Sequence, residues 1–248
     1  MTSSSLGRVA ALAASIVWCT ANAQSVRQPA DGFISGVVSS ARGPEAGVWV
    51  IAETKELKTP LIKIVVTDDA GRYVLPQLPT ATYSVWVRGY GLADSDRVEG
   101  RPGDTALNLT AKIAGSPGEA AKVYPGNYWF SLLEPPAPNQ FPGTGESGNG
   151  IPPAMASQAH WMFNLKSGCN FCHQLGNEIT RSLGHMDHLG FKTPEEAWIY
   201  RTQLDVRGSS MAGTMAQWGL NTGAREMADW TRRIADGEVP PLPPRPRR

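Results

Sequence analysis

Short apolar runs rich in valine, isoleucine, threonine and tyrosine recur between residues 33 and 113, separated by clusters of glycine, proline and aspartate. In the run TYSVWVRG, Tyr83, Val85 and Val87 occupy every second position, which is the pattern of a strand with one buried face. Several short strands with regular turn signals are typical of an antiparallel β-sandwich. The sequence therefore predicts an N-terminal antiparallel β-sandwich over residues 31–113.

The pattern changes to a helical one over residues 154–237. Ser157 is a favourable helix-capping residue, so it predicts a first helix over about 158–167. Gly168 is expected to end that helix. Several short helices in about 80 residues are typical of a small all-α domain, so the chain is predicted to have two domains of different class.

A second helix is predicted from Thr193 to about residue 206, because a proline takes the first helical position and Glu196 can complete a capping box. The last helix, over about 223–236, has an apolar stripe at intervals of three and four residues. Between these two helices, the stretch 207–219 is rich in small residues and is predicted to be a loop.

Glycine and proline dominate residues 114–153, which predicts a linker between the two domains. Aromatic residues within 124–130 indicate that part of it docks on a domain face, or forms a short helix over 127–133 at an edge of the sandwich. The basic, proline-rich tail 238–248 is expected to be a solvated end.

Residues 1–23 have the order of a secretory signal peptide: Arg8, then an apolar run over 9–18, then Ala21-Asn22-Ala23. Cleavage near Ala23 predicts a periplasmic or secreted protein. The formal net charge of +1 gives no sign of nucleic-acid binding, which needs a basic face. The chain has no other apolar stretch long enough for a membrane span.

The clearest chemical signal is the stretch SGCNFCHQLG, which contains Cys169, Cys172 and His173. C-x-x-C-H is the attachment sequence of c-type haem, in which two cysteines form thioethers and the histidine is the proximal iron ligand. A small disulfide, a thioredoxin-like redox pair and half of a zinc site are the alternatives. The redox pair needs a βαβ context and the zinc site needs further ligands, and neither is evident.

A sixth iron ligand in an electron carrier is often methionine. Met211 is the favoured candidate because small residues surround it in the predicted loop, and Met215 is the alternative. His185 and His188 could instead be distal ligands, which would give a haem of lower potential. An open sixth site would indicate a haem enzyme.

Two parts of the chain resemble known families. Residues 31–113 resemble the carboxypeptidase regulatory-like domain, a transthyretin-like β-sandwich with a carbohydrate-binding-like fold. Thr67-Asp68, Gly71, Tyr73 and Leu78 carry this resemblance, together with Tyr83, whereas Ala81 stands where glycine is common. Residues 155–237 resemble small periplasmic cytochrome c domains, through the C-x-x-C-H motif and through Met211.

The tandem of these modules is similar to the N-terminal part of bacterial exported proteins that also carry a virginiamycin B lyase-like propeller, so the chain is a stand-alone or a shortened form. The resemblances imply an exported monohaem c-type cytochrome with one covalent haem c, which transfers electrons to periplasmic redox partners. The rival hypothesis is a module that binds a carbohydrate or a protein through the sandwich and also carries a haem domain.

Overall fold

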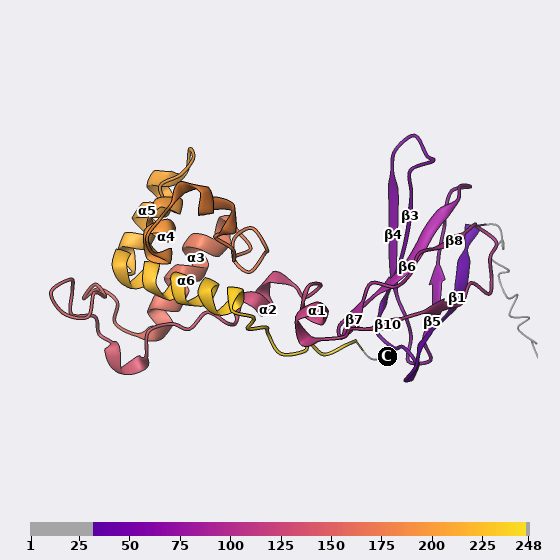
Figure 1. Cartoon of the computed structure of the whole chain (residues 1–248), viewed down its shortest axis with the longest axis horizontal. Helices are drawn as coiled ribbons and strands as arrows, with labels where there is room; N and C mark the ends of the chain where they lie inside the picture. The colour runs from indigo at the N-terminus through magenta and orange to yellow at the C-terminus, as the bar shows by residue number, and fades with distance from the viewer. Residues whose placement is uncertain (1–31, 247–248) are drawn as a thin grey trace, which may run out of the picture.

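The computed structural model describes residues 32–246, and the predicted signal peptide lies outside them. The molecule is elongated, with a strand-rich part at one end and a helical part at the other (Figure 1). Two short helices and the last described residues lie between them. The expected combination of antiparallel sheets and helices in separate parts of one chain is therefore observed.

Short strands make up the strand-rich part. One sheet has the order β4-β3-β6-β8, a second has β2-β1-β5 with β9 beside β1, and a third pairs β10 with β7. All pairs are antiparallel except β1 with β9. The strands are β1 (Ile34–Ser40), β2 (Gly43–Pro44), β3 (Trp49–Thr54), β4 (Leu61–Val66), β5 (Arg72–Leu75), β6 (Tyr83–Arg88), β7 (Leu92–Ala93), β8 (Val98–Gly100), β9 (Leu109–Thr110) and β10 (Lys112–Ile113).

The alternation predicted for the run TYSVWVRG is confirmed. Tyr83, Val85 and Val87 on β6 are buried in a core shared with strands of the other sheets. Trp86 points to the opposite face and is nevertheless buried, because the guanidinium groups of Arg88 and Arg97 both lie 4.8 Å from its ring centroid. Cation–π stacking thus covers an aromatic ring on the outer face of the sheet.

The helical part contains six α-helices and two 3-10 helices among the described residues, if the two short helices near the strand-rich part are included. Both predicted caps are confirmed, because the side chain of Ser157 accepts a hydrogen bond from the amide of His160, and that of Thr193 from the amide of Glu196. The elements are α1 (Pro117–Ala121), α2 (Gly126–Phe130), η2 (Pro138–Gln140), α3 (Gln158–Cys172), η3 (Gly184–Leu189), α4 (Pro194–Arg201), α5 (Gly208–Gln217) and α6 (Leu220–Ala235).

Three local predictions in this part are wrong, since helix α4 ends at Arg201 and not at about residue 206, and two further differences concern α3 and α5. Helix α3 does not end at Gly168 but continues to Cys172, and the stretch predicted as a loop forms helix α5. One contact explains both, since a Cβ atom at Gly168 would overlap the methyl group of Thr214 in α5. The glycine therefore allows α3 and α5 to approach closely, and their packing stabilises a helix that its glycine and serine residues alone would not predict.

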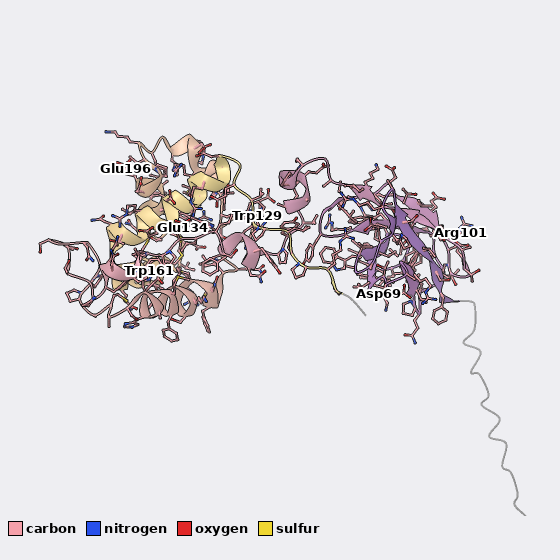
Figure 2. The ribbon with its side chains drawn as sticks, turned by 90° about the horizontal axis from the view of Figure 1, so that it is seen from below. Asp69, Arg101, Trp129, Glu134, Trp161 and Glu196 are labelled. Atoms are coloured by element: carbon pink, nitrogen blue, oxygen red, sulfur yellow. The ribbon has the colours of Figure 1, made fainter. Side chains whose placement is uncertain are left out.

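The segment 114–153, predicted as a linker with a docked aromatic part or a short helix over 127–133, is more structured than its glycine and proline content indicates. It contains α1, α2 and η2, and its residues Leu133 and Ile151 lie in the same buried core as α3 and α6. The side chain of Trp129, labelled between the two ends of the molecule in Figure 2, is also buried. Most of this segment therefore belongs to the helical part.

The tail also differs from the solvated end that was expected. Its described residues, 238–246, run back from the end of α6 to the strand-rich part (Figure 1). Pro240 and Pro243 are buried, and Arg245 forms an ion pair with Glu45. Charge and proline content suggested exposure, but apolar contacts and one buried carboxylate determine the position of this segment.

Candidate functional site

The residues of the C-x-x-C-H motif lie at the C-terminal end of α3. Cys169 and Cys172 are separated by three positions on the last turn, so they lie on neighbouring parts of one helix face. Both cysteines are free; Cys169 is half-buried and Cys172 is exposed. His173 is the C-cap residue with an extended backbone (φ −130°, ψ 138°), and its amide donates a 3.0 Å hydrogen bond to the carbonyl of Cys169.

The thiol of Cys169 packs against the helical core. Burial raises its pKa to about 12, and the neighbouring Cys172 thiol adds to that increase. Cys169 is therefore a protonated thiol at neutral pH. A thioredoxin-like redox pair depends on a lowered thiol pKa, so the local environment does not favour that alternative.

Large apolar side chains near the motif are exposed. Phe171, between the two cysteines, is 85 % exposed, and Phe163 two turns earlier on α3 is 66 % exposed. Ile179, shortly after the motif, and Val206, just before α5, are 72 % and 89 % exposed. Exposed apolar side chains of this size on and just after the helix that carries the motif indicate a surface that another apolar group covers.

Helices α3 and α5 run antiparallel. The rings of Trp161 and Trp218 lie 5.3 Å apart, and further along α3 Gly168 contacts Thr214. Extended by one more turn, this register brings Met211 beside the last turn of α3, which carries the two cysteines. Met211 is therefore on a helix and not in the predicted loop, and the register predicts a position for it on the side of α5 that faces the end of α3.

The two candidate methionines differ in their surroundings. Met211 is half-buried on α5, whereas Met215 is 1 % exposed and packs in the core near Gly223. A side chain that fills the core cannot leave it without creating a cavity. The structure therefore favours Met211 over Met215 as the residue that is free to bind a ligand.

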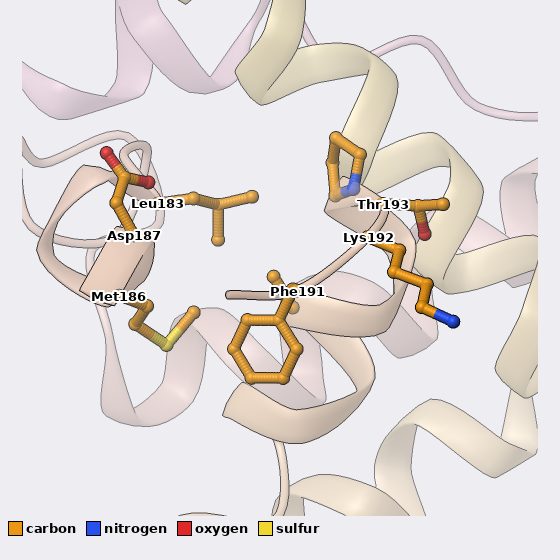
Figure 3. A pocket seen from close by; sticks show the side chains of 8 residues that line it. Leu183, Met186, Asp187, Phe191, Lys192 and Thr193 are labelled. Carbon is orange, nitrogen blue, oxygen red and sulfur yellow. The ribbon is translucent and has the colours of Figure 1, made fainter. Parts of the chain in front are cut away.

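The other candidates lie on η3. His185 and His188 are both exposed, and Met186 between them is buried. Met186 faces a cavity of about 240 Å³, shown in Figure 3 together with Phe191 and Asp187. This volume is below the range of about 300–1,000 Å³ that is usual for ligand pockets. The lining residues are Leu183, Met186, Asp187, Phe191, Lys192, Thr193, Pro194 and Ala197.

Two arginine side chains donate hydrogen bonds to backbone carbonyls of the segment that follows the motif. The guanidinium group of Arg201, on α4, donates hydrogen bonds to the carbonyls of Ile179 (2.8 Å) and Ser182 (2.9 Å). Arg181 donates to the carbonyl of Gly176 (2.8 Å) and lies 4.1 Å from the ring centroid of Trp129.

Burial lowers the pKa of both arginines below the usual arginine value. Neither Arg181 nor Arg201 belongs to a sequence motif, so no local pattern indicates its role. The bonds of Arg201 hold the segment between the motif and η3 against α4, whereas Arg181 bonds within that segment and stacks on Trp129 of α2.

No family model matches the chain, and no curated protein matches it. Among residues 32–246, no three histidine, cysteine, aspartate or glutamate side chains gather in a way that could hold a metal ion. Within the same range, no helix has both the length and the apolar character that crossing a bilayer requires.

Proposed function

We propose that the chain is an exported monohaem c-type cytochrome that transfers electrons. In this proposal, the helical part is a cytochrome c-like domain, and the strand-rich part is an accessory β-sandwich of the carboxypeptidase regulatory-like kind. One observation carries the proposal: two free cysteines lie one turn apart at the end of α3, and His173 follows them directly. Other exported redox proteins would be its partners.

The residues at the end of α3 fit a covalently attached haem. The two thiols are unpaired, and their spacing on one helical turn is the spacing at which two thioether bonds form. His173 is exposed where the helix ends, so its imidazole is available as a ligand. A haem held there supplies one iron that changes between the ferrous and ferric states, which is the chemistry of an electron carrier.

The surrounding side chains have separate roles in this proposal. Phe163, Phe171 and Ile179 provide apolar surface that excludes water from a bound macrocycle. Met211, from the neighbouring helix α5, would be the second residue to hold the iron, and its thioether would favour the ferrous state and raise the potential. Arg201 keeps the segment after the motif in place through its bonds to backbone carbonyls.

Mass spectrometry of the protein matured in a host with haem-attachment machinery tests the proposal. Under denaturing conditions the mass should equal that of the polypeptide plus one haem. Cys172→Ala should weaken the attachment, and His173→Ala should change the absorption spectrum. His160→Ala is the matched control, because His160 is an exposed histidine on the same helix, and it should change neither. A mass equal to that of the bare polypeptide would contradict the proposal.

A further inference from the structure

The tail, residues 238–246, lies against the strand-rich part, and its last residues form one wall of a groove there. The groove lies between the turn that contains β2 and the turn at Tyr90–Gly91. Its strand-rich wall consists of Arg42, Pro44, Glu45, Ala46, Tyr90 and Gly91, and the tail residues from Leu242 to Pro246 complete it.

The best-defined contact in the groove is an ion pair between Arg245 and Glu45. The side chain of Glu45 is only 6 % exposed, and in the described part of the chain its carboxylate has no other ion pair or hydrogen bond. The Nε of Arg245 also donates a 2.8 Å hydrogen bond to the carbonyl of Tyr90. A buried carboxylate is tolerated when it is paired, so the groove requires a cation at this position.

The shape of the groove also matches the tail. Gly47 has φ +65°, and a Cβ atom there would overlap the carbonyl group of Pro246. The side chain of Leu242 packs against Gly91, 3.5 Å from the position that a Cβ atom would take. Gly47 therefore lets the backbone of the tail approach closely, whereas the contact at Gly91 is an ordinary packing contact with a side chain.

The other end of the tail is attached to the helical part. Glu238 forms a 2.6 Å ion pair with Arg233 on α6. Val239 packs in a small cluster with Tyr90 and Tyr124, whose rings meet edge to face at 5.6 Å. The tail thus contacts both parts of the molecule within nine residues.

We propose that this groove is a binding site for a proline-rich segment that carries an arginine, and that its occupant is the chain's own residues 238–246. The tail then acts as a clasp that fixes the helical part to the strand-rich part. Proline restricts the free segment to an extended backbone, so little conformational entropy is lost on docking. Arg245 provides specificity, because its planar fork donates to a carboxylate and a carbonyl at once. This proposal does not depend on haem binding.

Hydrogen–deuterium exchange on the full chain tests the clasp. Arg245→Ala should make amides in residues 42–48 and 88–92 exchange about tenfold faster or more, because the groove then opens locally. Arg72→Ala is the matched control, since it removes an exposed ion pair with Asp68 in the same part of the molecule and should leave those amides unchanged. Arg245→Lys should give an intermediate exchange rate, because lysine keeps the positive charge but lacks the planar guanidinium group that donates two hydrogen bonds at once.

A second variant separates the clasp from general destabilisation. Arg245→Ala leaves the Glu45 carboxylate buried and unpaired, whereas the double variant Glu45→Gln/Arg245→Ala has no buried charge. The double variant should have near wild-type thermal stability of the strand-rich part and still show fast exchange in the groove. A free peptide of residues 238–248, added in excess, should restore protection in Arg245→Ala and restore less in the double variant, which lacks the Glu45 carboxylate that Arg245 of the peptide binds.

Unchanged exchange in both variants would overturn the proposal. So would protection that depends on protein concentration together with a dimeric mass in solution, because the occupant would then come from a second copy.

Discussion

The indole Nε1 of Trp230 donates a 2.9 Å hydrogen bond to the backbone carbonyl of Trp129, across 101 residues of sequence. Both side chains are buried. The bond joins α6 to α2 and makes the segment before α3 part of the helical core. A segment with linker composition is thus fixed by one of the last helices of the chain.

This bond predicts that Trp230→Phe destabilises the helical part. The substitution removes the indole donor and leaves the Trp129 carbonyl with the amide of Leu132 at 3.3 Å, so the loss is that of one hydrogen bond, about 0.5–1.5 kcal/mol, in addition to the lost packing. Trp218→Phe is the matched control, because Trp218 is equally buried but its Nε1 has no hydrogen-bond partner among the described residues. Urea denaturation should therefore show a larger loss for Trp230→Phe, and equal losses would contradict the role of the bond.

The same packing predicts where the helical part can be separated. A chain that starts near Ala114 should keep its helical circular dichroism and melt cooperatively, because it retains α1, α2 and Leu133. A chain that starts at Ile151 lacks those elements and exposes the apolar surface that they cover. Its cooperative thermal transition should be weakened or lost, and an unchanged transition would show that the linker hypothesis was correct.

If the proposed function holds, Met211 and Met215 should respond differently to substitution. Met211→Ala should remove the weak sulfur-to-iron charge-transfer band of the oxidised protein and lower its potential. Met215→Ala should keep that band and instead cost about 2–5 kcal/mol of stability, because Met215 fills the core. Loss of the band in Met215→Ala alone would move the ligand to that residue. A wild-type protein without the band would favour His185, His188 or an open site.

Thr67 is predicted to be important for the stability of the strand-rich part. Its hydroxyl group is buried, donates to the carbonyl of Glu45 (2.7 Å) and accepts from the amide of Val48 (3.1 Å). Thr67→Val keeps the shape but leaves both backbone groups unpaired, which should cost about 1–3 kcal/mol or more. The exposed Thr59 provides the control, since Thr59→Val should change the unfolding midpoint little.

Glu226 should make stability depend on pH. Burial raises its pKa above the ordinary 4.5, Arg225 opposes this, and Asp229 and Glu134 add to the increase. An acid with a raised folded-state pKa contributes stability below its unfolded pKa and loses that contribution as pH rises through the folded value. The stability of Glu226→Gln relative to wild type should therefore increase between pH 4 and 7. A difference that stays flat, or that falls with pH, would contradict the burial of this carboxyl group.

Local physical chemistry determined much of this protein from the sequence alone. The alternation of Tyr83, Val85 and Val87 predicted a buried strand face, because successive side chains of a strand point to opposite sides. Ser157 and Thr193 predicted two helix starts, because each side chain can cap the amides of its own first turn. The C-x-x-C-H motif identified the candidate site because it too depends only on neighbouring positions. Its three residues lie within one helical turn and the position that follows it.

Only the tertiary structure decided the features that depend on distant partners. Gly168 would end an isolated helix, but α3 continues through it because Thr214 packs against the position where a Cβ would lie. The same contact helps to make the 207–219 stretch largely helical, so that Met211 lies on α5 and not in a loop.

The tail has the composition of a solvated end, yet it is docked because Arg245 meets a buried carboxylate 200 positions earlier in the chain. Composition describes what a segment would do in water. It does not show that a distant part of the chain buries a charged group, and that this group has a partner only when the segment binds it.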